Sequence, residues 1–161
     1  MASKRAPVTP ALRVLREAGV SFTEHLFDYH RHPGAEEAAE AIRVDPFATA
    51  KTIVFTTDTG AGVVALMHGN LEVSTKKLAR EMGVRSVRPA TQREADRFTG
   101  YQFGGTSPLG MRSDLPVFAQ RTLADLETVY VNGGSRGFLI GIDPATLFDL
   151  TGAVLADVAV E

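Results

Sequence analysis

The 161-residue sequence predicts an α+β domain with a mixed β-sheet. Two β-hairpin patterns support this class: β-branched and aromatic runs joined by glycine turns, at residues 52–67 and 128–142. Short amphipathic stretches with helix-capping residues come before, between and after them. Strands and helices therefore do not alternate as in a regular βαβ array, which favours a mostly antiparallel or mixed sheet.

The N-terminal part is predicted to contain a helix, a strand and a second helix. Thr9 before Pro10 is typical of an N-cap followed by proline at the first helical position, and Gly19 ends that helix. Residues 20–27 are predicted to form a strand, and residues 35–42, rich in Ala and Glu, a second helix. A histidine-containing loop joins the two.

The middle of the chain is predicted to form a hairpin and two helices. Residues 52–56 favour a strand, and a glycine-rich turn leads back into residues 63–67. Ser74 begins a third helix that Gly83 ends. A capping box at residues 91–94 opens a fourth.

The C-terminal part supplies the remaining strands. These are predicted at residues 117–119, 128–131 and 138–142, and the last two are joined by a glycine turn. Asp143 then caps a last helix, and residues 153–158 are predicted to form a closing strand.

Composition indicates one folded domain. Hydrophobic residues make up 44% of the chain and charged residues 22%, the balance of a globular protein. No internal repeat or linker is evident, so residues 1–161 are predicted to be a single domain. The first residues have no apolar run, so we expect neither a signal peptide nor a membrane span, and a cytoplasmic protein.

Charge and cysteine content exclude several kinds of site. The absence of cysteine excludes a disulfide, a thiolate metal site and a cysteine nucleophile. The net charge of −2 gives no overall positive field, and DNA is not an expected partner. A local basic cluster is either a solvated helix face or a contact for an RNA backbone. It consists of Lys76, Lys77, Arg80, Arg85 and Arg88.

The first candidate site is the glycine loop that begins at Gly104-Gly105. Glycine has no Cβ to block a ligand and tolerates positive φ, so backbone N–H groups can face a carbonyl or phosphate oxygen. Thr106, Ser107 and Pro108 complete the loop, and proline fixes its shape. A tight turn explains the glycines equally well. Ser107 is not favoured as a nucleophile, because no histidine or aspartate is evidently paired with it.

Two further motifs accompany this loop. Lys51-Thr52 open an apolar strand, so the Lys51 ammonium either projects into a pocket or is an exposed strand-end lysine. In a pocket it would stabilise developing negative charge. Asn132-Gly133-Gly134, with Arg136, form either a simple hairpin turn or a pocket wall that hydrogen-bonds a ligand.

No metal ion or cofactor is predicted. His30 and His32 lie in a proline-flanked loop, His25 on a strand and His68 before a turn, and none has a carboxylate at ligand spacing. The glycine pair in the first hairpin turn does not open a helix, which excludes a dinucleotide-binding fingerprint.

Together these motifs resemble the YbaK/EbsC family of aminoacyl-tRNA editing deacylases. The resemblance extends from Thr9 to Asp157 and depends mainly on Lys51 and the two glycine loops. It implies a mixed, barrel-like sheet flanked by helices, as in the editing domain of prolyl-tRNA synthetase. It also implies a cofactor-free hydrolase or lyase of translation fidelity that removes a wrong amino acid, most often cysteine, from tRNA(Pro).

The resemblance implies roles for individual residues. Lys51, Gly104 and Gly105 are the implied catalytic residues. In the cysteinyl members the substrate's own thiol attacks its ester carbonyl, so no protein nucleophile is required. The implied substrate-binding residues are Phe27, Thr52, Thr106, Ser107, Pro108, Asn132, Gly133, Gly134 and Arg136.

Three residues depart from the family pattern. Phe27 stands where a tyrosine is common, Asn132 where a serine is common, and Leu139 replaces a polar residue of some members. Each changes a hydrogen bond at the pocket, so cysteine, alanine and other small residues stay open as the amino acid removed. Cyclisation and direct hydrolysis stay open too. The rival interpretation is a non-catalytic module that binds prolyl-tRNA synthetase or tRNA.

Overall fold

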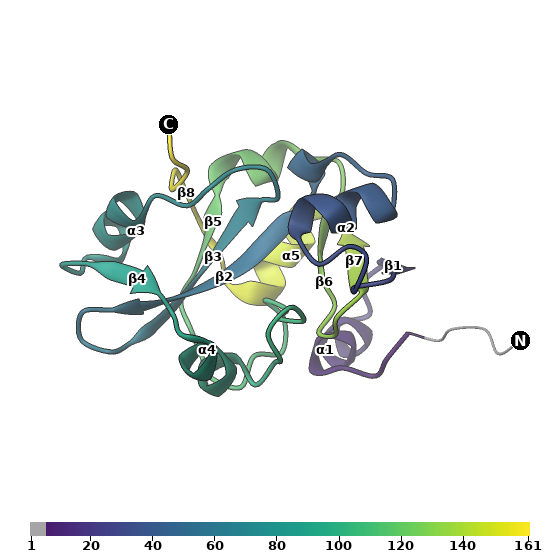
Figure 1. The fold of residues 1–161 in the computed structure, drawn as a ribbon, viewed down its shortest axis with the longest axis horizontal. Helices are drawn as coiled ribbons and strands as arrows, with labels where there is room; N and C mark the ends of the chain where they lie inside the picture. Colours follow the sequence, from purple (N-terminus) through teal and green to yellow (C-terminus); the bar gives the residue numbers. More distant parts are fainter. Residues whose placement is uncertain (1–5) are drawn as a thin grey trace, which may run out of the picture.

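The computed structural model describes residues 6–161. Helices and strands alternate irregularly along this part of the chain (Figure 1). The helices are α1 (Pro10–Ala18), α2 (Ala35–Ala41), α3 (Thr75–Met82), α4 (Gln92–Thr99) and α5 (Pro144–Thr151), with short 3-10 helices η1 (Pro46–Ala48) and η2 (Arg121–Asp125). The strands are β1 (Thr23–Leu26), β2 (Ala50–Thr57), β3 (Gly62–His68), β4 (Val87–Pro89), β5 (Val117–Gln120), β6 (Val129–Asn132), β7 (Phe138–Ile142) and β8 (Val154–Ala156).

The strands form two sheets, which confirms the predicted α+β class with mixed pairing. The larger has the order β4-β2-β3-β5-β8, with antiparallel pairs around β2 and parallel pairs on both sides of β5. The smaller has the order β1-β7-β6 and is antiparallel. Figure 1 shows the smaller sheet near α1 and α2, and β4 at the opposite side near α3 and α4.

The mixed, barrel-like sheet that the resemblance implied takes the form of two sheets that are not closed into a barrel. The two sheets are joined between strands by a single parallel bridge from Thr49 to Tyr130, and β4 and β8 are the edges of the larger sheet. β4 is three residues long and pairs only with Phe55–Thr57 of β2. A strand this short cannot carry the pairing around to the smaller sheet.

The predicted helix starts are confirmed by their capping geometry. In each, a side-chain oxygen accepts a hydrogen bond at 3.1 or 3.2 Å from the backbone N–H three residues later, which satisfies a donor that the helix leaves unpaired. The four capping residues are Thr9, Ser74, Thr91 and Asp143.

Two predicted strands are shorter than expected because their partners are short. Residues 20–27 are paired only from Thr23 to Leu26, where β7 runs alongside. Residues 153–158 are paired only from Val154 to Ala156, against the end of the four-residue β5.

Two apolar clusters hold the domain together. The larger lies where the two sheets meet under α1 and α5, and contains Leu12, Leu66 and Ile140. The smaller covers the other face of the larger sheet under α3, and contains Phe55 and Leu78. In the described part of the chain, no helix is long and apolar enough to cross a membrane.

Candidate active site

A cavity of about 460 Å³ lies between β2, α2, the turn from β4 to α4, and the loop that follows α4. Its walls are mainly apolar, and the ends of β6 and β7 complete them. Several site residues predicted from the sequence line it: Phe27, Lys51, Thr52, Gly104, Thr106 and Asn132.

The cavity occupies an uncovered stretch of strand edge. Ala90 N–H donates to Val54 O at 2.9 Å, and Thr49 bridges to Tyr130, so the edge of β2 is covered on either side of residues 50–53. Alternate residues of a strand direct their backbone groups to the same edge, so the N–H and C=O of Thr52 face the same way as those of Val54. The backbone of Thr52 is therefore directed toward the cavity. The Thr52 hydroxyl is buried and has no hydrogen-bond partner among residues 6–161.

Lys51 is the only Lys, Arg, Asp or Glu among the described residues that line the cavity. It pairs with Met67 in the β2–β3 hairpin, and its side chain is 21% exposed. Its Nζ lies 3.6 Å from Oε1 of Glu72, whose side chain is 80% exposed. An ion pair with so exposed a partner contributes little, so a ligand oxygen can replace Glu72 at small cost.

The first glycine loop places its two glycines in different roles. Gly104 has a φ of +85°, and a Cβ there would lie 2.5 Å from the Tyr29 hydroxyl, so only glycine fits without strain. Gly105 does not have positive φ, and its N–H donates to Gln102 O at 2.8 Å. Of the two glycines, therefore, only Gly104 uses the positive φ that glycine tolerates. That residue packs against the second loop, where a Cβ would lie 2.9 Å from Arg136 N.

The first glycine loop adds main-chain donors at the cavity to that of Thr52, namely the N–H groups of Gly104 and Thr106. Within residues 6–161 neither N–H has a hydrogen-bond acceptor, and both residues line the cavity. Together with Lys51 they give an otherwise apolar space hydrogen-bond donors and one positive charge. Such donors stabilise an oxygen on which negative charge develops.

The second glycine loop supports the first. Asn132 Nδ2 donates to Gly104 O at 3.2 Å, while Asn132 Oδ1 accepts from the N–H groups of Gly134 at 2.7 Å and Ser135 at 3.1 Å. The Asn132 side chain is therefore occupied in joining the two loops. Arg136 Nε donates to Phe103 O at 2.8 Å, an exposed hydrogen bond that also joins the second glycine loop to the first.

The N-terminal end of α1 holds both loops. Thr9 Oγ1 donates to Gly133 O at 2.6 Å, and a Cβ on Gly134 would lie within 3 Å of Thr9 and Tyr101. A Cβ on Gly110 would lie 2.8 Å from the backbone of Pro10. Gly133 and Gly134 are therefore packed behind the cavity, where they position its wall.

Ser107 and Pro108 are also buried outside the cavity lining. Ser107 Oγ accepts a hydrogen bond from Leu109 N–H at 3.2 Å, so the hydroxyl stabilises the turn of its own loop. That Ser107 is not a nucleophile stays a prediction, as do the substrate-binding roles of Ser107 and Pro108.

Tyr101 closes the base of the first glycine loop. Its ring is buried, its hydroxyl donates to Leu109 O, and burial raises its pKa to about 12. The neutral phenol is thus the form that the folded protein holds.

Tyr101→Phe should lower the free energy of unfolding by about 1–3 kcal/mol, because the buried Leu109 carbonyl loses its partner. In the wild type, the raised pKa of Tyr101 adds to the free energy of unfolding. This addition is fully present below pH 10.0, the usual pKa of the phenol, and is lost as pH rises toward about 12. Urea unfolding of both proteins, at neutral and at alkaline pH, measures the difference. Equal stabilities at neutral pH would show that the hydroxyl does not hold the loop.

His68 is a structural residue beside the start of β2. It is buried; its Nε2 lies 2.6 Å from Thr122 Oγ1, its Nδ1 contacts Phe47 O, and its ring stacks on Phe47 at 3.7 Å. Burial lowers the pKa of its imidazole. Among the described residues, no group of three or more His, Asp or Glu side chains could hold a metal ion.

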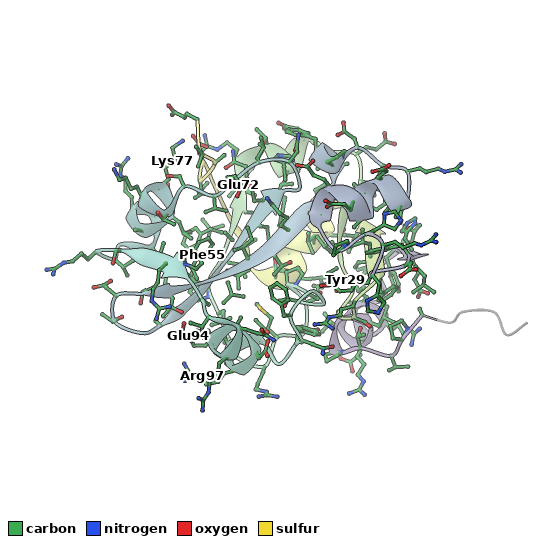
Figure 2. The ribbon with its side chains drawn as sticks, viewed as in Figure 1. Tyr29, Phe55, Glu72, Lys77, Glu94 and Arg97 are labelled. Atoms are coloured by element: carbon green, nitrogen blue, oxygen red, sulfur yellow. The ribbon has the colours of Figure 1, made fainter. Side chains whose placement is uncertain are left out.

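The predicted basic cluster is partly neutralised. Lys77 Nζ lies 3.2 Å from Asp157 and 3.4 Å from Glu161, and Arg88 lies 2.7 Å from Glu94. Figure 2 shows Lys77 near the upper edge and Glu94 near the lower edge at the same end of the molecule.

Several cavity residues have no marker in the sequence. Tyr29 and Phe103 come from loops, Tyr130 from β6, and Ala90 and Ala95 from the segment around the start of α4. The Thr91 capping box did signal a helix start there, but nothing local indicates that this start faces β2.

A family model for the aminoacyl-tRNA editing domain matches residues 32–150, which include Lys51 and both glycine loops. The chain belongs to the aminoacyl-tRNA editing domain family. The resemblance inferred from Lys51 and the glycine loops is therefore confirmed.

Relatives and solved structures agree with this assignment. EbsC of Enterococcus faecalis, named as a candidate Cys-tRNA(Pro)/Cys-tRNA(Cys) deacylase, is 30% identical over 151 residues, 93% of this chain and 92% of that protein. A proline–tRNA ligase of Streptococcus thermophilus is 30% identical over 140 residues, 84% of this chain but 21% of the ligase. A crystal structure of a candidate trans-editing enzyme for prolyl-tRNA synthetase has a TM-score of 0.81 at 27% identity, and covers 96% of this chain and 100% of its own.

Proposed function

We propose that this protein is a trans-editing enzyme that removes a mischarged small amino acid, cysteine above all, from tRNA(Pro). Aminoacyl-tRNA editing is the removal of a wrong amino acid from tRNA, so membership of this family makes the chain an aminoacyl-tRNA deacylase. The observation that carries the site is the cavity itself. Among the described residues, Lys51 is the only Lys, Arg, Asp or Glu that lines this mainly apolar space, and Gly104 and Thr106, whose N–H groups have no acceptor within residues 6–161, line it too.

This arrangement suits attack on an ester carbonyl. As the attacking atom bonds to the carbonyl carbon, negative charge develops on the carbonyl oxygen, and a preorganised cation and N–H donors stabilise that charge. Lys51, Gly104 and Thr106 supply these groups. The hydroxyl of Ser107 lies outside the cavity lining and accepts a hydrogen bond in its own turn, so Ser107 is not the attacking group. We infer that water or the substrate itself supplies that group.

For a cysteinyl substrate the attack can be intramolecular. The thiol sulfur bonds to the ester carbonyl carbon, the bond to the tRNA oxygen breaks, and the proton of the thiol passes to that oxygen to give a free 3′ end. Holding the ester in one orientation makes such ring closure efficient. Water attack gives the free amino acid instead, and it serves side chains that cannot cyclise.

Specificity for tRNA(Pro) is proposed from the relatives. EbsC carries Cys-tRNA(Pro) in its name, and the ligase relative contains a similar segment as 21% of its length. An enzyme of this size that acts in trans would remove amino acids from tRNA released by prolyl-tRNA synthetase, which is the candidate partner.

The apolar wall favours selection of the amino acid by size. Phe27 and Leu139 line the cavity, and neither offers a hydrogen bond to a substrate side chain. Asn132, the third departure from the family pattern, uses its amide oxygen and one amide hydrogen to join the glycine loops, which leaves one N–H for a substrate. Apolar walls discriminate poorly between small side chains.

We expect the wild-type protein to deacylate Cys-tRNA(Pro) and, measurably, Ala-tRNA(Pro). Phe27→Tyr should shift the preference toward cysteine, because a buried hydroxyl costs about 1–3 kcal/mol when the substrate leaves it unpaired. Deacylation of Cys-, Ala- and Ser-tRNA(Pro) by both proteins measures this. Strict selectivity for cysteine in the wild type, unchanged by the substitution, would assign specificity to other residues.

The same assay tests the rival interpretation. A module that only binds tRNA or the synthetase would deacylate none of the three substrates. Binding without turnover, under conditions in which EbsC-type relatives are active, would exclude the proposed function.

A further inference from the structure

An exposed aromatic side chain stands at the mouth of the cavity. Phe103 lines the cavity, yet 60% of its surface is exposed. It directly precedes Gly104, whose amide is one of the unpaired donors described above. A phenylalanine this exposed contributes little to the core. Its ring is instead available as a flat surface within reach of anything that enters the cavity.

Arg136 and Tyr29 stand beside it. Arg136 Nε donates to the Phe103 carbonyl at 2.8 Å, and the Arg136 guanidinium carbon lies 5.2 Å from the centre of the Tyr29 ring. The Tyr29 hydroxyl would lie 2.5 Å from a Cβ on Gly104, so this ring also borders the loop. Figure 2 shows Tyr29 on the side of the molecule where β1, β6 and β7 lie. We call Tyr29, Phe103 and Arg136 the aromatic rim.

The chemistry of the rim matches unpaired nucleotides. Single-stranded nucleic acid is bound by aromatic side chains that stack on bases, combined with cations that meet the phosphates. Arg136 is exposed, and its Nη groups make no hydrogen bond or ion pair to the rest of residues 6–161. One ring and one cation, a few ångströms from a cavity for an aminoacyl ester, suit the nucleotide that carries the ester.

We propose that the aromatic rim receives the unpaired 3′ end of the tRNA, with the terminal base stacked on Phe103 and the adjoining phosphate contacted by Arg136. This inference rests on the proposed function and extends it from the aminoacyl group to the nucleotide. It makes Phe103 a positioning residue, because it holds the substrate in place and takes no part in the bond changes.

The first test is kinetic. Phe103→Ala should raise the KM for aminoacyl-tRNA and lower kcat/KM by about 5- to 100-fold, with kcat at saturation nearly unchanged, since stacking of one base is lost. Phe103→Tyr should retain wild-type values. Val154→Ala is the matched control, because Val154 is 53% exposed and lies in β8, outside the cavity lining. An unchanged kcat/KM in Phe103→Ala would overturn the proposal.

The second test reports binding without catalysis. The chain contains no tryptophan, so Phe103→Trp introduces a single indole signal. A short single-stranded RNA ending in CCA should quench this fluorescence, whereas a blunt RNA duplex of the same length should not. Absence of quenching by the single strand, or equal quenching by the duplex, would overturn the proposal.

The two tests separate failure of the inference from failure of the proposed function. If the wild type deacylates tRNA and Phe103→Ala matches it, only the rim is wrong. If single-stranded RNA quenches the Phe103→Trp signal but no aminoacyl-tRNA is deacylated, RNA binding at the aromatic rim is supported and the proposed deacylase function is wrong.

Discussion

Lys51→Ala is expected to lower the rate of aminoacyl-tRNA deacylation by about 100-fold while the fold is retained. Lys51 is the only formal charge in the described cavity lining, so its loss leaves the developing negative charge to the loop amides alone. Its only ion pair within residues 6–161 is with the exposed Glu72, so stability should change little. Single-turnover deacylation and thermal unfolding of the variant measure the two quantities separately.

Arg13→Ala is the appropriate control for that experiment. Arg13 is an exposed residue of α1 that lies outside the cavity lining and outside the basic cluster, so its removal changes the net charge equally and leaves the site intact. Deacylation by Lys51→Ala within a few-fold of the control would remove Lys51 from the mechanism.

Gly104→Val should abolish measurable deacylation, a loss of at least about 100-fold. The substitution places a β-branched side chain at a φ of +85° and within 2.5 Å of the Tyr29 hydroxyl, so either the loop moves or Tyr29 is pushed into the cavity. Both outcomes displace an amide that the reaction requires. Deacylation at saturating substrate is the measurement, because a blocked site cannot be rescued by concentration.

Gly60→Val is the control that separates the effect of backbone strain from the effect of a side chain placed at the cavity. Gly60 has a φ of +89° in the β2–β3 turn, and a Cβ there would meet no heavy atom within 4 Å, so the substitution carries a similar backbone cost far from the cavity lining. We expect a similar loss of stability and normal activity. If Gly104→Val were as active as Gly60→Val, the loop would be a turn and nothing more.

Local signals in the sequence were reliable where the structure depends on local contacts. The caps at Thr9, Ser74, Thr91 and Asp143 were predictable because each bonds a backbone group three residues away. The barrel was not predictable in this way, since closure depends on which strands meet at long range. The three-residue β4 and the single bridge from Thr49 decide that question.

The same difference between local and long-range contacts explains which parts of the site could be predicted. Lys51, Thr52 and Gly104 line the cavity as expected, because a strand end and a left-handed glycine place them there. The resemblance implied a catalytic role for Gly105 and a substrate-binding role for Ser107, but in the structure Gly105 packs against the second loop and Ser107 bonds to its own turn. Asp157, which neutralises Lys77 of the basic cluster, is 80 residues away and leaves no local trace in the sequence around Lys77.

Helix α1 lies outside the segment that matches the family model, yet it contacts the site. The family match begins at residue 32, yet Thr9 and Pro10 at the start of α1 pack against both glycine loops. The contacts that support the site therefore extend beyond the segment that sequence similarity delimits. A protein shortened to residues 32–150 would keep Lys51 and the bonds that Asn132 and Arg136 make between the loops, and would lose the support that α1 gives to both of them.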